Sequence, residues 1–329
     1  MHAIAAFAGL PIESHDALVD VELPMPDHGP RDLLIRVEAV SVNPVDVKVR
    51  VNRSTPDRAR VLGYDGAGVV EAVGAEVEGF APGDEVWWAG DLKRAGSNAE
   101  FQAVDHRIVA HKPTTWTFAQ AAALPLTALT ALETFGDHLR LDATSTGTLL
   151  MVGGAGGVGS IAIQLAKATT DVRVLATASR EASSTWVREM GADAVVDHRD
   201  LVAGVLAEAP EGVEYVFSAY TPGNIASYAK IGTPFGHVVV IDDGAEDIAP
   251  LKSKSMSLHW EFMFTRAFHQ AKDMHRQGEM LAQVAHLADR GEIRSTATEF
   301  LDGFTAASLR EAHRRVESTS VIGKVVVHR

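Results

Sequence analysis

The feature that most constrains the fold is a glycine-rich turn in the middle of the chain. An apolar run of strand length, 148–152, leads into the turn, and apolar residues then recur at helical spacing over 158–166. Gly154, Gly156 and Gly159 fit the pattern G-x-G-x-x-G within this strand–turn–helix order. The strand–turn–helix order supports an interpretation as a binding motif, because this order is typical of the phosphate-binding unit of a dinucleotide-binding fold.

Each glycine of the turn has an expected task. The first permits the tight turn, the second lets the backbone approach a pyrophosphate, and the third lets the helix pack on the strand. The start of the helix then offers free N–H groups and a positive dipole to the phosphates. The predicted cofactor-binding loop consists of Gly154, Gly156, Gly157, Val158 and Gly159. The alternative is a structural glycine turn without a ligand.

Length and composition narrow the class of protein. At 329 residues the chain is too long for one ordinary core, so we expect two domains. The net charge of -13 argues against a nucleic-acid partner, which requires a basic surface. The sequence contains no cysteine, which excludes disulfides, thiol nucleophiles and cysteine-bearing zinc sites. Because neither a signal-peptide pattern nor a bilayer-spanning apolar run occurs, we expect a cytoplasmic protein without a membrane partner.

The first third of the chain predicts a β-rich domain. Short apolar runs alternate there with turn-forming sequences, a spacing that is typical of a barrel or folded sheet. A strand over 35–40 stops at Asn43-Pro44, because the residue before a proline is restricted and proline lacks an N–H. The other strands expected in this part are 68–73, 84–88 and 100–104.

From Phe118 onwards, strand-like and helical runs alternate, which implies a doubly wound parallel sheet. The segment 119–131 predicts a helix that Pro125 either kinks or divides by starting a second helix. A long amphipathic helix is expected over 267–289, and a final strand over 323–328. The elements expected between them are 172–177, 183–190, 194–196, 201–208, 213–218 and 237–241.

Three segments of the first domain carry an ordered set of motifs. They are Gly63-Tyr64-Asp65-Gly66-Ala67-Gly68-Val69-Val70, Gly83-Asp84-Glu85-Val86 and Gly96-Ser97-Asn98-Ala99-Glu100-Phe101. Together with the glycine turn, they resemble the medium-chain dehydrogenases/reductases, most closely the zinc-free quinone-oxidoreductase and enoyl-reductase branch. A subgroup of that branch is labelled zinc-type alcohol dehydrogenase-like, and this chain is similar to its members.

The resemblance implies an α/β fold class with two domains. A GroES-like, β-rich catalytic domain would comprise 1–125 and 266–329, and a Rossmann dinucleotide-binding domain with a doubly wound parallel sheet would comprise 126–265. The resemblance also implies a homodimer, since relatives pair through the cofactor domain. The run 258–264 fits this expectation, because it predicts an edge strand that is prone to association.

The resemblance also bears on metal binding. In zinc-dependent relatives, cysteine and histidine hold the catalytic zinc near the positions corresponding to Asn43, Tyr64 and 124–126. Here those positions carry an amide, a phenol and mostly apolar groups, so the resemblance implies no metal site. Histidines elsewhere in the chain are the remaining alternative, namely His259, His269 and His275.

Without a Lewis acid, the expected reaction is hydride addition to an enone or a quinone, because the negative charge that forms is delocalised onto oxygen. Reduction of a simple ketone would place that charge on one alkoxide and demand stronger stabilisation. By resemblance, the catalytic candidates are Asn43, Tyr64 and Lys48. Asn43 can donate to an enolate oxygen or to a ribose hydroxyl of the cofactor, and Tyr64 can donate a proton or a hydrogen bond. The alternatives are a turn residue for Asn43, packing for Tyr64 and a solvated surface charge for Lys48.

The end of the second strand of the nucleotide-binding domain predicts the cofactor. NAD-preferring folds place an acid about twenty residues beyond the glycine turn. Here Ser179 and Arg180 stand in that region, and no carboxylate occurs there before Glu181. A hydroxyl and a guanidinium fit a 2′-phosphate, so we expect NADP(H). Further cofactor contacts are expected, from the resemblance or from a place at a strand end, at Thr127, His198, Ser218, Asp242 and Lys324.

Other reaction classes lack their motifs. No tyrosine is followed by lysine four residues later, which excludes a short-chain dehydrogenase, and no G-x-S-x-G elbow indicates a serine hydrolase. Two alternatives to quinone or enone reduction stay open. One is a ketone or alcohol oxidoreductase of the same fold, and the other is a non-catalytic NADPH-binding sensor or structural protein.

Overall fold

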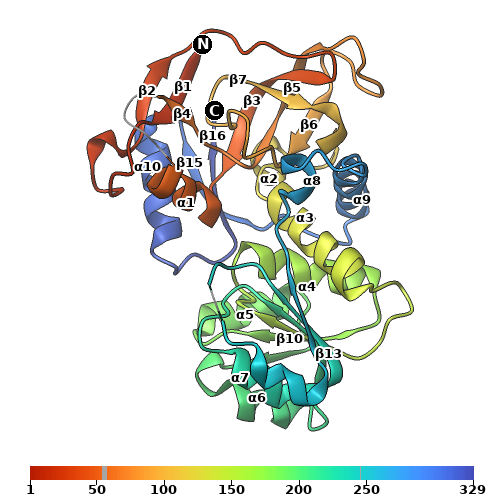
Figure 1. Ribbon diagram of the computed structural model, residues 1–329. Helices are drawn as coiled ribbons and strands as arrows, with labels where there is room; N and C mark the ends of the chain where they lie inside the picture. Colours follow the sequence, from red (N-terminus) through yellow and green to blue (C-terminus); the bar gives the residue numbers. More distant parts are fainter. Residues whose placement is uncertain (54–57, 245) are drawn as a thin grey trace. The chain divides into compact units, whose positions relative to one another are not determined.

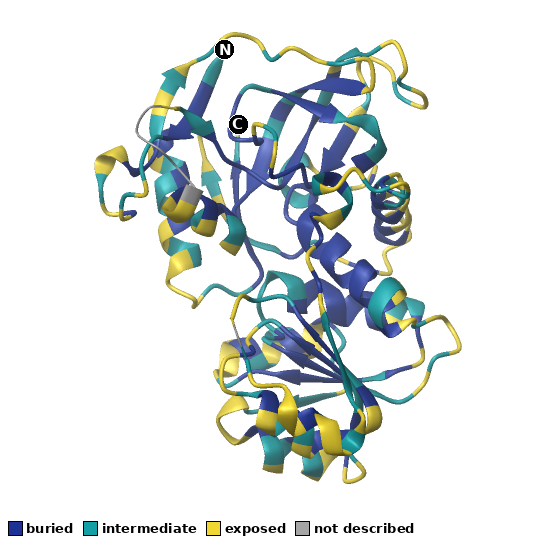
Figure 2. Cartoon of the chain, viewed as in Figure 1, coloured by how far each residue is buried: buried dark blue, intermediate teal, exposed yellow. Residues whose placement is uncertain are grey.

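The computed structural model describes residues 1–53, 58–244 and 246–329. The chain folds into two compact units (Figure 1). Unit 1 combines Met1–Leu126 with Phe264–Arg329, and unit 2 consists of Thr127–Met263. In both units the strands are largely buried, while most exposed residues lie in loops and on some of the helices (Figure 2).

Unit 2 is built on a six-stranded sheet in which every neighbouring pair runs parallel. The strand order is β11-β10-β9-β12-β13-β14. The bounds are β9 Thr148–Val152, β10 Arg173–Thr177, β11 Ala194–Val196, β12 Val213–Ser218, β13 Gly232–Val240 and β14 Ser257–Trp260. The chain therefore builds outward from β9 and then returns to β12 on the other side of β9. This order confirms the predicted doubly wound sheet and places its topological switch point between β9 and β12.

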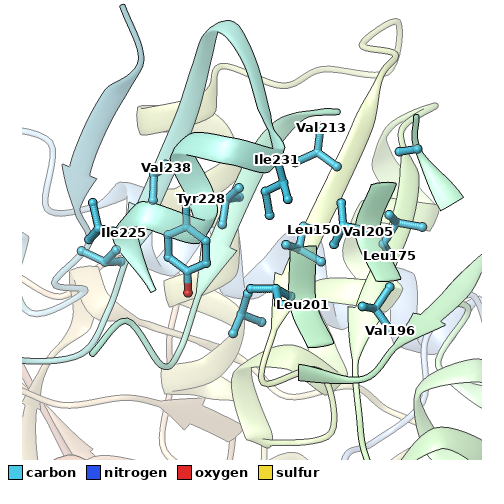
Figure 3. Packing of buried hydrophobic residues seen from close by; sticks show 14 of the residues in the cluster. Leu150, Leu175, Val196, Leu201, Val205, Val213, Ile225, Tyr228, Ile231 and Val238 are labelled. Atoms are coloured by element: carbon cyan, nitrogen blue, oxygen red, sulfur yellow. The ribbon is translucent and has the colours of Figure 1, made fainter. Parts of the chain in front are cut away.

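The core of unit 2 explains why its strands are apolar throughout. Four helices accompany the sheet: α4 Gly157–Thr169, α5 Glu181–Glu189, α6 Leu201–Glu208 and α7 Ile225–Ile231. On one face of the sheet, Leu150 of β9 and Val238 of β13 belong to the same buried cluster as Val205 of α6 and Ile231 of α7 (Figure 3). Leu149, on the alternate face of β9, is fully buried as well. A strand that is covered on both faces needs a continuous apolar run rather than an alternating one.

Unit 1 is β-rich, as predicted. Its larger sheet has the strand order β15-β16-β3-β5-β6-β8 with β7 paired to β3, and a smaller sheet has the order β2-β1-β4. The bounds are β1 His2–Ala6, β2 Val19–Glu22, β3 Asp32–Ser41, β4 Arg60–Val61, β5 Gly66–Val73, β6 Glu85–Trp88, β7 Phe101–Asp105, β8 Val109–His111, β15 Ala297–Asp302 and β16 Lys324–His328. The last strand, β16, runs antiparallel to β3, with Val326 opposite Ser41. The C-terminal segment is therefore an integral part of this sheet.

The helices around 118–133 and 265–289 decide between two alternatives of one prediction and correct another prediction. Pro125 starts a second helix rather than kinking one, because α2 (Phe118–Ala121) ends before α3 (Pro125–Glu133) begins. The single helix predicted over 267–289 is wrong, since α8 (Thr265–Phe268) and α9 (Arg276–Asp289) are separate helices. Gln270 lies between them with a positive φ of 49°, a left-handed conformation that interrupts a right-handed helix.

A helix that the sequence pattern did not reveal follows β3. Helix α1 (Pro44–Arg53) begins with a proline, which suits the first helical position because its missing N–H needs no partner there. The Asp46 side chain accepts the backbone N–H of Asn43 at 2.9 Å and so caps the start of the helix. The order Asn-Pro-x-Asp is a signal that would have predicted it. The remaining helix of the unit, α10, spans Ala306–Glu317.

Within the part of the chain that the structure describes, no helix combines the length and the apolar character that crossing a membrane requires.

Candidate active site

The glycine loop of unit 2 joins the carboxyl end of β9 to α4, beside the switch point of the sheet. Gly153 adopts a positive φ of 82°, and Gly156 forms the N-cap of α4. A Cβ atom on Gly159 would lie 2.4 Å from the Gly153 carbonyl oxygen, and one on Gly154 would lie 2.9 Å from the Cβ of Ala176. Both of these glycines are therefore required by the packing of helix and strand.

Gly156 differs from its neighbours in the loop. Its φ of -75° is open to any residue, and the nearest atom to an added Cβ would be the Gly153 carbonyl oxygen at 3.5 Å, an ordinary contact. The protein alone therefore does not require glycine at this position. A phosphate that approaches the backbone at the start of α4 does require it. This absence of a structural need favours a ligand over a purely structural turn.

We expect Gly156→Ala to fold with only a small fall in Tm, since alanine is a poorer N-cap than glycine, but to bind NADPH at least about tenfold more weakly, because the added methyl group takes the space of the pyrophosphate. Fluorescence titration with NADPH measures the affinity, and differential scanning fluorimetry measures Tm. Gly136→Ala is the matched control, since an added Cβ there meets no atom within 4 Å. Unchanged affinity in Gly156→Ala would contradict a nucleotide site at this loop.

Two predicted cofactor residues lie at the same edge of the sheet as the glycine loop. Ser179 and Arg180 follow β10, which runs parallel to β9 with Ala176 opposite Met151. Ser179 is half-buried and Arg180 is exposed. The Arg180 backbone N–H donates to Ser183 Oγ at 3.2 Å, which makes Arg180 the N-cap of α5. His198, predicted near the adenosine, is exposed just after β11.

Ser218 is the last residue of β12 and Asp242 follows β13, and the side chains of both contact Thr221. Ser218 is fully buried, and its Oγ lies 2.8 Å from the Tyr228 hydroxyl and 3.2 Å from Thr221 Oγ1. Asp242 accepts the backbone N–H and the hydroxyl of Thr221, each at 2.6 Å. Burial raises the pKa of Tyr228, so its phenol stays protonated in this network. The contacts hold the segment after β12, and cofactor binding by Ser218 or Asp242 stays a prediction.

In unit 1, the predicted residue Asn43 lies at the centre of a buried hydrogen-bond network. Its side-chain Nδ2 donates to Asp65 Oδ2 at 2.6 Å, and its Oδ1 accepts from Lys324. Ser41 Oγ also donates to Asp65 Oδ2, at 2.7 Å. The other carboxylate oxygen, Oδ1, accepts the backbone N–H of Leu126 at 2.7 Å. Asn43 is therefore more than the turn residue that the alternative assigned to it.

Sequence reasoning overlooked the two carboxylates of this network. Asp46 accepts the backbone N–H groups of Asn43 and Gly63, each at 2.9 Å, and complete burial raises its pKa to about 7. Asp65 is 0% exposed. The available signal was an aspartate within a glycine- and valine-rich segment, Gly63 to Val70, where a buried charge needs a partner.

The other two catalytic candidates, Tyr64 and Lys48, and the expected cofactor contact Thr127 have different surroundings. Tyr64 is 1% exposed, and its ring meets Phe264 edge-on with centroids 5.4 Å apart, as expected for packing. Lys48 lies on α1 and is exposed, in keeping with a solvated charge. Thr127, on α3, is buried. None of these placements assigns a chemical role to the three residues.

Comparisons with known proteins agree with this architecture. Residues 29–129 match the alcohol dehydrogenase GroES-like domain, and residues 190–327 match the zinc-binding dehydrogenase domain. A zinc-type alcohol dehydrogenase-like protein of Staphylococcus aureus is 39% identical over 90% of this chain and 90% of its own length. The chain belongs to the medium-chain dehydrogenase/reductase family. It is an oxidoreductase of that family, as the resemblance implied.

Further members of the family are similar along nearly the whole chain. The human mitochondrial NAD(P)H oxidoreductase RTN4IP1 is 31% identical over 92% of this chain and 82% of its own length. A Rhizobium etli structure described as a zinc-dependent alcohol dehydrogenase has a TM-score of 0.97 at 45% identity, covering 100% of this chain and 98% of its own. Escherichia coli quinone oxidoreductase complexed with NADPH has a TM-score of 0.85 at 20% identity, with full coverage of both chains, and shows the shared fold.

Several of these relatives are named for zinc, but the residues at the corresponding positions of this chain differ from zinc ligands. Asn43, Tyr64 and Leu126 stand where the resemblance places the metal ligands, and an amide, a phenol and an apolar side chain are not the ligands that zinc takes in proteins. Over residues 1–53, 58–244 and 246–329, no group of three histidine or acidic side chains is arranged to hold a metal ion. The residues at these three positions therefore do not fit a zinc site.

Proposed function

We propose that this oxidoreductase uses NADPH to reduce quinones or α,β-unsaturated carbonyl compounds without a metal. The observation that carries the proposal is the Asn43 amide, which Asp65 and Lys324 hold among residues that do not fit zinc. One amide donor gives modest electrophilic help, which suffices when the developing charge is delocalised but not for a simple ketone. The NAD(P)H oxidoreductase and quinone oxidoreductase among the similar proteins support the same reaction class.

Each residue has a separate task in this proposal. The loop 154–159 and the N-terminus of α4 bind the pyrophosphate, and Ser179 with Arg180 binds the 2′-phosphate. NADPH, when bound there, supplies the hydride. Asn43 Nδ2 carries two hydrogens, and because Asp65 accepts one, the other is donated to the substrate oxygen that gains charge. Water or Tyr64 then protonates the α-carbon of an enone.

The reaction is tested with NADPH that carries deuterium at nicotinamide C4 and with an enone substrate. We expect deuterium at the β-carbon of the product, because the hydride adds to the end of the conjugated system and leaves an enolate. Mass spectrometry and NMR of the product locate the label. Deuterium at the carbonyl carbon would show a ketone reductase instead, and tight NADPH binding without any turnover would favour the sensor or structural alternative.

Arg180 provides a test of cofactor preference. We expect NADPH to bind more tightly than NADH, and Arg180→Ala to narrow that difference by about 1–3 kcal/mol, the usual range for a hydrogen bond to a charged group. Titration of both nucleotides against wild type and variant measures the difference. Arg188→Ala, an exposed arginine at the other end of α5, is the control and should leave the preference unchanged. Equal affinities for the two nucleotides in the wild type would contradict the assignment.

The expected homodimer is also part of the proposal. β14 is an edge strand of the unit 2 sheet in the described residues, and Trp260 and Phe262 are 54% and 47% exposed. An edge strand presents unpaired N–H and C=O groups, and exposed aromatic residues beside it favour association. These features support pairing with a second copy of the chain through β14.

A further inference from the structure

Three charged or polar side chains meet inside unit 1, away from water. Asn43, Asp65 and Lys324 are 1%, 0% and 4% exposed. Lys324 begins β16 and lies beside the end of β3, where the Val42 backbone N–H donates to the Val325 carbonyl at 3.2 Å. Asp65 immediately precedes β5, which pairs with β3 on its other side. Segments that are far apart in the sequence thus converge on one point of this sheet.

Oxygen atoms surround the ammonium group of Lys324. Its Nζ donates to the Val42 carbonyl at 3.1 Å, to Asp65 Oδ2 at 3.2 Å and to Asn43 Oδ1. An ammonium has three hydrogens, and these three acceptors account for all of them. Burial lowers the pKa of Lys324, while the Asp65 and Asp46 carboxylates act in the opposite direction. No hydrogen remains for a nucleotide, which argues against the cofactor contact expected from the sequence.

The ammonium contacts Asn43, one of the positions that the resemblance assigns to the metal ligands of zinc-dependent relatives, and Asp65, the chain neighbour of Tyr64, which is another. Asp65 Oδ2 accepts hydrogen bonds from the side chains of Ser41, Asn43 and Lys324, and Asp65 Oδ1 accepts one from the Leu126 backbone N–H. A divalent ion that took these oxygens would lie next to the ammonium and be repelled by it. We propose that Lys324 is a built-in cation that replaces a metal in this chain and, together with Asp65, acts as a positioning residue for the Asn43 amide.

The pair selects one of the two orientations of the amide. In the observed orientation, Oδ1 of Asn43 faces the ammonium, which only donates, and Nδ2 faces the carboxylate, which only accepts. Turning the amide over would set donor against donor and acceptor against acceptor. The two charges therefore keep a donating N–H group at a defined place. This part of the inference rests on the proposed function, in which that N–H group binds the substrate oxygen.

A double-mutant cycle in the full chain tests the pairing of the charges. Lys324→Met leaves the Asp65 carboxylate buried without its cation, and we expect Tm to fall by about 10 °C. Asp65→Asn should lower Tm similarly, because the ammonium is then unpaired. The double variant Lys324→Met/Asp65→Asn removes both charges and should recover most of the loss. Losses that simply add in the double variant would overturn the pairing.

Metal analysis of the wild type needs no variant. After dialysis against zinc sulfate and then against buffer, we expect less than stoichiometric zinc by mass spectrometry and no shift of Tm when Zn²⁺ is added. One tightly bound zinc per chain that is lost in Asp65→Asn would overturn the replacement of the metal by Lys324.

Kinetics separate positioning from simple stability. In the double variant, Tm should recover to near the wild-type value and the NADPH Kd should be unchanged. The kcat for an enone should nevertheless stay at least about tenfold below wild type, because neutral neighbours no longer select one orientation of the Asn43 amide. Recovery of kcat together with Tm would show a purely structural pair and overturn the positioning role. If the wild type reduces neither enones nor quinones, the proposed function fails, while the Tm cycle and the zinc analysis still decide on the built-in cation.

Discussion

Asn43→Ala is expected to lower kcat for an enone by about 10²–10³-fold, the usual effect of removing one donor to an oxyanion. The affinity for NADPH should change little, because in the proposal the glycine loop 154–159 and Ser179 with Arg180 bind the phosphates of the nucleotide, whereas Asn43 binds the substrate oxygen. Steady-state kinetics with a saturating enone give kcat, and fluorescence titration gives the NADPH Kd. A variant that loses NADPH affinity and keeps kcat would contradict the role assigned to the amide.

Ser41→Ala is the matched control for this substitution. Ser41 donates to the same carboxylate oxygen of Asp65 as Asn43 does, at 2.7 Å against 2.6 Å. If Asn43→Ala acted only by disturbing Asp65, then Ser41→Ala would lower kcat as strongly. We expect Ser41→Ala to retain most of the activity, because it leaves the amide and its orientation intact.

The free energy of unfolding should depend on pH through a buried histidine of α10. His313 is 0% exposed, and within the described residues neither ring nitrogen has a hydrogen-bond partner. Burial, aided by the charge of Arg50, lowers the pKa of His313 to about 3. The unfolded chain binds a proton near pH 6.5 while the folded chain does not, so stability falls as the pH drops from about 6.5 to 3. The full effect amounts to about 5 kcal/mol, at 1.36 kcal/mol for each pH unit between the two pKa values.

His313→Leu removes the titrating group and should abolish this part of the pH dependence. Asp46 acts in the opposite direction, since its raised pKa stabilises the folded state as the pH falls from about 7. The difference between wild type and variant therefore isolates His313, and urea unfolding at several pH values between 4 and 8 measures it. Leu309→Met, on the same buried face of α10, is the control and should shift stability equally at every pH. Parallel curves for wild type and His313→Leu would contradict the prediction.

Local patterns predicted a large part of the fold. The strands around 35–40, 172–177 and 213–218 were recognisable because a half-buried or buried strand has a characteristic apolar pattern. The break in the helix predicted over 267–289 was not recognisable, because a left-handed residue such as Gln270 is held by its surroundings rather than by its own preference. Helix α1 was not predicted, although its capping signal, the order Asn-Pro-x-Asp at 43–46, is present in the sequence.

The sequence by itself determined the glycine loop and the doubly wound sheet, because the glycines, the strand before them and the helix after them are neighbours in the chain. Only the tertiary structure decided the charged centre. Asp65 and Lys324 are 259 positions apart, and no feature close to either residue indicates the other. Their pairing depends on β16 lying against β3, since a buried charge is stabilised by whichever partner the sheet brings to it. Because of that pairing, we propose Lys324 as a positioning residue for Asn43 rather than as the cofactor contact that was expected.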